Sequence, residues 1–150
     1  MVNAMSEVCL NILTKQRVPK GVDPLMRIWS LDHWLSALDR VCGIQRLEES
    51  ADRQCFILHF DADRSEPDRV EVERTRSDSR ISVTHRIPPP GIQSLSAEWW
   101  TEAEHPGILF VCRRIIMDEA VYTPVMARNM FRLLRENIVK LTGQASCNSE

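Results

Sequence analysis

The spacing of apolar residues predicts a chain made mostly of short strands. Val8, Leu10, Ile12 and Thr14 recur at every second position, and a period of two is typical of a strand with one buried face. This first strand should end before Pro19, because proline donates no hydrogen bond to a sheet. Turn-forming residues separate six further strand-like runs, at residues 41–47, 54–60, 70–76, 80–87, 92–102 and 107–117.

Two short helices are predicted between the first and second strands. Asp23 followed by Pro24 is typical of an N-cap and a first helical position, so a helix should run from there through Trp29. Asp32 is a candidate start for the second helix.

A long helix is predicted at the end of the chain, where apolar residues begin to recur at steps of three and four. Thr123-Pro124 suits its start and Gly143 its end, which gives about five turns. Its apolar positions are Val125, Met130, Leu133, Leu134, Ile138 and Leu141.

This order of elements favours one α+β domain over residues 1–150. A curved antiparallel sheet of about six to seven strands would wrap around the long C-terminal helix, with an internal apolar cavity between them. Residues 144–150 follow the predicted end of the helix and are expected to form a flexible tail.

Composition excludes several classes of function. The formal net charge is −2, which gives no broad attraction to nucleic acid or to an anionic membrane. The five cysteines include no CxxC pair, so we expect reduced thiols and a cytoplasmic protein. No apolar stretch approaches the roughly 18 residues that span a bilayer. No metal site is expected, because the acidic loop 61–68 lacks the glycine and final glutamate of a calcium loop.

The most informative pattern lies in residues 70–74. Val70, Val72 and Arg74 share one face of the predicted strand, and Glu71 and Glu73 share the other. The valine face should be buried, and a buried guanidinium needs a carboxylate, a set of carbonyls or a wet, ligand-holding cavity. Arg74 is therefore either a structural residue, paired in the core or reaching outward, or a functional one.

His85 and Trp99 are predicted to face the same interior. His85 shares its strand face with Ile81 and Val83. A lone inward histidine is commonly a satisfied core residue, but an arginine and a histidine facing one cavity together favour chemistry. Of Trp99 and Trp100 one must face inward, and we assign Trp99, either as a core residue or as a stacking surface for a planar ligand.

Other positions keep two interpretations. His33 and Trp34 either gate the mouth of a cavity or pack at a helix start. Arg113 and Arg114 must point to opposite faces, so one of them lines the cavity unless the pair is a solvated surface feature.

Taken in order, these residues resemble the polyketide aromatase/cyclases of the tetracenomycin type, in the START/Bet v 1-like (SRPBCC) helix-grip superfamily. The resemblance rests on His33-Trp34, on Val72-Glu73-Arg74, on the stretch 80–87 with its His85-Arg86-Ile87 ending, and on Trp99. It covers residues 70–117 most closely and the whole chain more loosely. Arg76, on the same face as Arg74, is a second match for the family arginine.

What the resemblance implies is a polyketide cyclase without metal or organic cofactor. A poly-β-ketone tethered to an acyl carrier protein would undergo regiospecific aldol cyclisation and dehydration in the cavity. The arginine matching Arg74 would polarise a ketone. His85 is the candidate proton donor, because the single tyrosine, Tyr122, does not match the cavity tyrosine of some family members. The residues expected to contact substrate are Trp34, Val72, Val83, Trp99 and Met130.

Partners and alternatives complete the predictions. An acidic carrier protein would need a basic rim, for which Lys15, Arg17 and Lys20 form the nearest cluster, unless they are an ordinary solvated face. The protein should be a monomer or homodimer. The competing hypothesis is a non-catalytic binding or transport protein for a lipid, quinone or polyketide. A third has Arg74 paired in a core with no ligand-sized cavity.

Overall fold

The computed structural model describes residues 6–38, 40–60, 69–88 and 91–143. The acidic loop 61–68, part of the triple proline and the expected tail 144–150 lie outside the described residues. Within these described ranges, seven strands and three helices follow one another. They are β1 (Glu7–Arg17), α1 (Pro24–Trp29), α2 (Leu31–Ala37), β2 (Val41–Glu49), β3 (Arg53–Phe60), β4 (Arg69–Ser77), β5 (Arg80–Ile87), β6 (Ile92–Trp100), β7 (Ile108–Asp118) and α3 (Pro124–Thr142).

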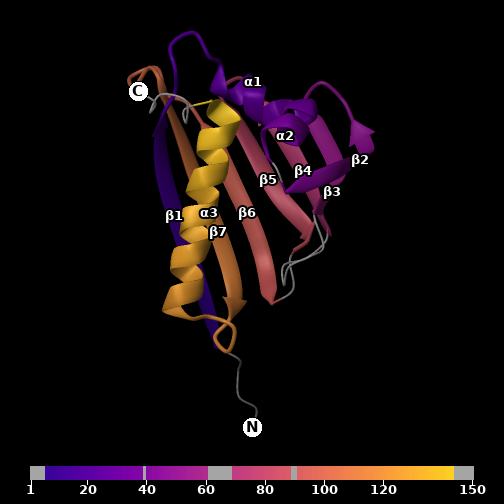
Figure 1. Ribbon diagram of the computed structural model, residues 1–150, viewed down its shortest axis with the longest axis vertical. Coiled ribbons are helices and arrows are strands. Elements are labelled where there is room, and N and C mark those ends of the chain that lie inside the picture. Colours follow the sequence, from indigo (N-terminus) through magenta and orange to yellow (C-terminus); the bar gives the residue numbers. More distant parts are fainter. Residues whose placement is uncertain (1–5, 39, 61–68, 89–90, 144–150) are drawn as a thin grey trace.

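All seven strands form one antiparallel sheet in the order β1-β7-β6-β5-β4-β3-β2. The sheet curves, and α3 crosses its concave face while α1 and α2 close one end (Figure 1). The predicted α+β architecture, with a curved sheet wrapped around a long final helix, is confirmed.

The helix boundaries follow from local hydrogen bonds that the sequence made visible. Asp23 caps α1 by accepting from the backbone N–H groups of Leu25 and Met26, at 3.2 and 3.3 Å. Thr123 caps α3 through its hydroxyl, which accepts from Met126 N at 3.0 Å. Gly143 ends α3 in the left-handed conformation at φ 78°, which glycine adopts without steric cost.

Ser30 forms the corner between the two short helices. It is both the C-cap of α1 and the N-cap of α2, where its hydroxyl accepts from His33 N at 3.3 Å. The Ser30 N–H also donates to Met26 O at 3.0 Å. This sharp corner turns the last carbonyls of α1 toward the interior of the sheet, where β3 and β4 supply donors for them.

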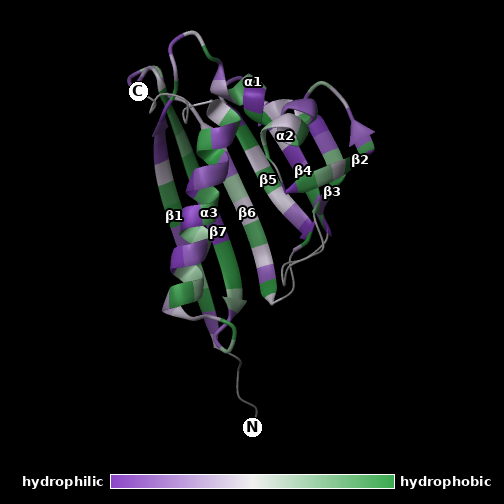
Figure 2. Cartoon of the chain, viewed as in Figure 1, coloured by the Kyte–Doolittle hydropathy of each residue, from purple (hydrophilic) through white to green (hydrophobic). Residues whose placement is uncertain are grey.

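Buried side chains form two clusters, one near each end of α3. The larger packs α1, α2 and the C-terminal turn of α3, through Ile138 and Leu141, against the sheet. The smaller contains Leu95, Ile115 and Met117. Buried and more exposed positions alternate along β4, β5 and β6 (Figure 2), so these strands bury one face, as predicted, whereas β3 and β7 each bury three consecutive residues. The cavity described below borders the C-terminal half of α3, from Leu133 to Leu141, and shares much of its wall with the larger cluster.

Candidate functional site

A cavity of about 280 Å³ lies between the concave face of the sheet and α3. Its walls are mainly apolar side chains, including Phe56, Val72, Val83 and Leu134. Leu133, Asn137 and Lys140 border it from α3 and are themselves exposed, so the cavity meets solvent along this helix. The volume lies close to the lower end of the roughly 300–1,000 Å³ typical of ligand pockets.

Arg74 points into this interior from β4 and is buried, with 1% of its surface exposed. Its guanidinium donates to the carbonyl oxygens at the end of α1: Nη1 to Ile28 O at 2.7 Å and Nη2 to Trp29 O at 2.9 Å. Nε and Nη2 also donate to Gln54 Oε1, at 2.9 and 2.5 Å. Of the partners foreseen for a buried arginine, a set of carbonyls is the one that the fold provides.

Three aromatic rings surround the same guanidinium. The Arg74 Cζ atom lies 5.1 Å from the ring centroids of Trp29 and Phe56 and 5.4 Å from that of Trp34. Aromatic faces attract a desolvated cation, so they offset part of the cost of burial. Burial lowers the pKa of Arg74 to about 9, and the side chain still carries its charge at neutral pH.

Three buried side-chain nitrogens on the cavity wall have no hydrogen-bond partner within the described part of the chain. They are Nδ1 of His85, Nε1 of Trp99 and Nε of Arg113, and all three residues line this cavity. Buried polar groups are nearly always paired, so three exceptions in one cavity indicate a place for a polar ligand atom or water. This cluster is called the donor group below.

Electrostatics reinforce that interpretation. The pKa of His85 falls to about 4, because burial disfavours the charged ring and the nearby Arg113 repels it. His85 is therefore neutral at physiological pH. Burial also lowers the pKa of Arg113 to about 10, which leaves it charged. Among the described residues that line the cavity, none is Asp or Glu.

Most of the residues proposed from the sequence meet at this cavity. Arg74, His85, Trp34, Val72, Val83 and Trp99 all line it. Met130 does not: it packs against the smaller core cluster, because the register of α3 points it toward β6 and β7. Arg76 is also not among the lining residues, since its Nε donates to Ala51 O at 2.9 Å and its guanidinium lies over Trp29.

His33 and Trp34 have the packing role that was one of their two interpretations. His33 Nε2 lies 2.7 Å from Leu141 O and so joins α2 to the last turn of α3. Trp34 Nε1 donates to Ile28 O at 2.8 Å, beside the Arg74 guanidinium. Both side chains thus hold the closed end of the cavity together.

Several residues in or beside the cavity were missed or left undecided by sequence reasoning. Arg113 faces inward while Arg114 is exposed, which resolves the predicted split of the pair. Gln54, the side-chain partner of Arg74, was not singled out, although it lies on the apolar face of β3 between Trp29 and Arg74. Arg40 and Lys140 border the cavity, whereas Lys15, Arg17 and Lys20 do not.

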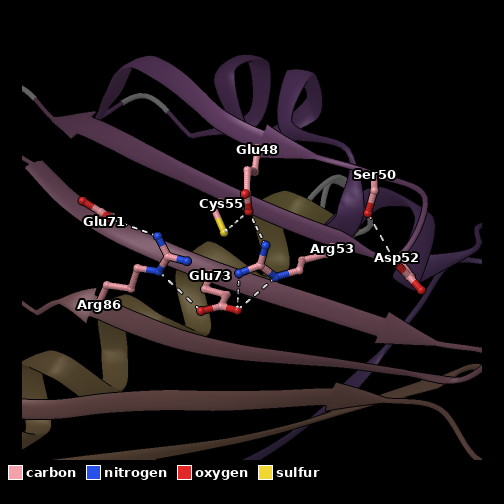
Figure 3. Close-up of polar contacts among 8 residues, drawn as sticks. All are labelled: Glu48, Ser50, Asp52, Arg53, Cys55, Glu71, Glu73 and Arg86. Carbon is pink, nitrogen blue, oxygen red and sulfur yellow. Dashed lines mark hydrogen bonds and ion pairs between the residues drawn. The ribbon is translucent and has the colours of Figure 1, made fainter.

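The outer face of the same strands carries a very different set of charges (Figure 3). Glu73 accepts from Arg53, through Nε at 3.1 Å and Nη2 at 2.9 Å, and from Arg86 Nε at 3.3 Å. Arg86 also pairs with Glu71 at 3.3 Å, and Arg53 pairs with Glu48. Here every guanidinium meets a carboxylate, and we call this network the outer ladder.

The seven-stranded sheet wrapped around α3 is a Bet v 1-like helix-grip fold, as comparison with solved structures shows. No family model matches the sequence, and no curated protein does. The ZhuI aromatase/cyclase from Streptomyces sp. R1128 superimposes with a TM-score of 0.66 at 14% identity, over 97% of each chain. The predicted fold class and the structural resemblance to aromatase/cyclases are thereby confirmed.

Two further structures show how widely this fold is used. The di-domain aromatase/cyclase BexL from the BE-7585A biosynthetic pathway gives a TM-score of 0.72 at 16% identity, with 90% of this chain covered. This chain spans 49% of BexL. Norcoclaurine synthase from Thalictrum flavum, in complex with dopamine and hydroxybenzaldehyde, gives 0.72 at 9% identity, over 97% of this chain and 91% of that one. At such identities the likeness is one of fold.

None of the three helices in the described ranges has the length and apolar character needed to cross a membrane.

Proposed function

We propose that this protein is a polyketide aromatase/cyclase, which directs the aldol cyclisation and dehydration of a poly-β-ketone in its internal cavity. The observation that carries the proposal is an apolar cavity that holds two guanidinium groups, Arg74 and Arg113, without a described carboxylate on its wall. Positive charge fixed in a water-poor site stabilises oxygen atoms that gain negative charge during reaction. The structural relatives named as aromatase/cyclases support the same assignment.

The reaction needs little beyond shape and charge. A methylene of the poly-β-ketone loses a proton, and the resulting enolate carbon bonds to a second carbonyl carbon of the same chain. The alkoxide formed takes up a proton, and loss of a second proton and of hydroxide, as water, leaves a double bond that becomes part of the aromatic ring. The apolar wall would hold the two reacting carbons close together, which is the proximity contribution to the rate.

The side chains would divide this work according to their hydrogen bonding. Arg113 is the group we assign to the ketone oxygen, because its Nε has no described partner. Arg74 has most of its N–H groups committed to Ile28, Trp29 and Gln54, so it supplies positive potential and at most one further hydrogen bond. Neutral His85 is able to accept the methylene proton and return it to the alkoxide.

Delivery by an acyl carrier protein is the second part of the proposal. Arg40 and Lys140 border the solvent side of the cavity, where the phosphate of a carrier-linked arm would approach. A positive rim favours an acidic partner chiefly by raising the association rate. We therefore place the carrier surface at Arg40 and Lys140 rather than at the cluster around Lys15.

The test is reconstitution with a minimal polyketide synthase and its carrier protein, followed by analysis of the products. Wild-type protein should convert a mixture of spontaneous cyclisation products into one aromatic product. Arg113→Met should lower the share of that product at least about tenfold, as expected for loss of a group that stabilises an oxyanion. Arg114→Met, on the same strand but exposed, is the matched control and should behave as wild type.

One outcome would replace the enzyme with the carrier hypothesis. If wild-type protein leaves the product mixture unchanged for several substrate lengths, the cyclase assignment fails. A hydrophobic ligand that copurifies with the protein would then support a binding or transport function.

A further inference from the structure

We propose that the cavity binds its ligand as an oxyanion, an enolate or a phenolate, and that Arg113 and Trp99 donate to the charged oxygen beside neutral His85. This inference rests on the proposed function for the identity of the natural substrate. It adds the ionisation state in which that substrate is bound. The binding itself requires no turnover, so it is testable separately from cyclase activity.

The register of the sheet places the donor group around one small residue. Arg113 on β7 pairs with Ala97 on β6, and Ala97 pairs with Val83 on β5. Trp99 lies two residues beyond Ala97, and His85 two residues beyond Val83 in the opposite direction along the sheet. All of these side chains face inward, because residues two apart on a strand share a face.

The chemistry of two of the three nitrogens favours negative charge. Trp99 Nε1 and Arg113 Nε carry only donors, whereas Nδ1 of neutral His85 accepts, because the ring donates from Nε2 to the Leu95 backbone carbonyl. An oxyanion accepts two or three hydrogen bonds at one atom, whereas each unpaired buried N–H costs about 1–3 kcal/mol. The Arg113 side chain has no described ionic partner, so an anionic ligand would also balance its charge.

The surrounding charges act in the same direction. The charged or titratable groups among the described lining residues are Arg40 before β2, Arg74 on β4, His85 on β5, Arg113 on β7 and Lys140 on α3, whereas α2, β2, β3 and β6 contribute none. Arg74 and Arg113 are buried cations, and the described lining contains no carboxylate to oppose these two. The rest of the wall is apolar, which suits a ligand whose negative charge is spread over a ring or a conjugated chain.

The experiment uses 2-naphthol as the probe. The cavity has the volume of about nine liquid water molecules, which is room for a bicyclic phenol. The absorbance spectrum separates naphthol from naphtholate, so a titration with protein between pH 6 and 9 reports the bound form. Wild-type protein should lower the pKa of the bound probe by at least about one unit, as an opposite charge nearby does. The hydroxyl proton passes to the buffer, and calorimetry in two buffers of different ionisation enthalpy should detect its release.

Three comparisons assign the effect to the donor group. Arg113→Met should remove the pKa shift of the probe and weaken naphtholate binding about tenfold. The same variant should bind naphthalene as tightly as wild type, because the apolar wall is intact. Arg114→Met should match wild type throughout. Urea unfolding of each variant checks that the fold is retained. If Arg113→Met does not fold, Trp99→Phe, which removes the Nε1 donor, should reduce the pKa shift of the probe.

Clear outcomes overturn the proposal. Binding of 2-naphthol in its neutral form, with an unchanged pKa, would contradict it, as would an equal shift in wild type and Arg113→Met. Binding of 2-naphthoate with a tenfold preference over naphtholate would assign the site to carboxylates instead. If the protein shifts the naphthol pKa but redirects no polyketide, this inference stands and the cyclase function fails. If it redirects a polyketide but leaves the naphthol pKa unchanged, the cyclase function stands and this inference fails.

Discussion

The two faces of β4 provide opposite environments for arginine side chains: the outer face pairs them with carboxylates, and the inner face does not. On the outer face, Glu73 binds both Arg53 and Arg86, and hydrogen bonds to Glu73 and Glu48 raise the pKa of Arg53. One residue further along the strand, Arg74 faces the interior, has no carboxylate partner among the described residues, and has its pKa lowered by burial. Chain neighbours thus lie in two different electrostatic environments.

The difference shows what the cavity excludes. The outer ladder proves that these strands readily supply carboxylates to guanidinium groups, yet the described cavity wall contains none. Arg74 relies instead on carbonyl dipoles, an amide and three aromatic rings, which stabilise a cation without cancelling its charge. The interior therefore keeps a positive potential, whereas the carboxylates of the outer ladder neutralise the charge of its guanidinium groups.

The largest effect is expected from breaking the inner side of this comparison. Arg74→Met leaves Gln54 Oε1 without its donor and removes bonds that hold the end of α1. Removing one member of a buried polar network is strongly destabilising, so we expect a loss of about 3 kcal/mol in the free energy of unfolding. Urea denaturation followed by tryptophan fluorescence measures it.

The outer ladder supplies the control for that variant. Arg53→Met removes a half-exposed guanidinium from Glu48 and Glu73, and solvent replaces the lost interactions. Its urea midpoint should agree with wild type within error. An equal loss in the free energy of unfolding for Arg74→Met and Arg53→Met would mean that the inner network stabilises the fold no more than the outer ladder does.

A smaller effect should appear on acidification, through His85. Its folded-state pKa of about 4 lies below the ordinary 6.5, so between these values the unfolded chain binds the proton and the folded chain does not. The stability contributed by neutral His85 is therefore present above about pH 6.5 and declines as pH falls through this window. By linkage we expect a loss of about 2 kcal/mol between pH 6.5 and about 4.5.

His85→Gln tests the assignment, since glutamine does not titrate. Urea midpoints of this variant should vary less with pH in that window than those of wild type. His59→Gln, on β3, is the matched histidine control and should retain the wild-type slope. An unchanged slope in His85→Gln would assign the acid sensitivity to other groups.

The smallest expected effect compares two inward tryptophans. Trp34 Nε1 donates to Ile28 O, whereas Trp99 Nε1 has no described partner. Replacing each by phenylalanine removes a similar volume, so the difference between the two variants reports mainly the hydrogen bond. Trp34→Phe should lose about 1 kcal/mol more in the free energy of unfolding than Trp99→Phe. Equal losses would show that Trp99 Nε1 is also hydrogen-bonded in the folded protein.

Local patterns were sufficient to predict most of the fold and part of the cavity. Alternation along β4 and β5 assigned the inward faces of Arg74 and His85, because the period of two is a property of the strand itself. The caps at Asp23 and Thr123, and the end at Gly143, likewise depend on neighbouring residues alone.

What could not be predicted depends on contacts between distant residues. The partners of Arg74 come from β3, 20 residues away, and from α1, 45 and 46 residues away, and no local signal connects them. Arg113 and Arg114 alternate faces in either register, so pairing with β6 was needed to decide between them. Met130 was placed at the cavity because helical periodicity does not define which side of α3 faces which part of the sheet.

The pairing of β1 with β7 has a consequence for how the chain is made. Arg17 pairs with Ile108, which the ribosome adds about 90 residues later. During synthesis β1 therefore waits without its neighbour while the hairpins from β2 to β6 are already able to form. A nascent chain released before β7 would expose the Leu10 and Ile12 face of β1 and would leave its backbone edge unpaired. Unpaired strand edges and exposed apolar faces of this kind recruit chaperones or aggregate.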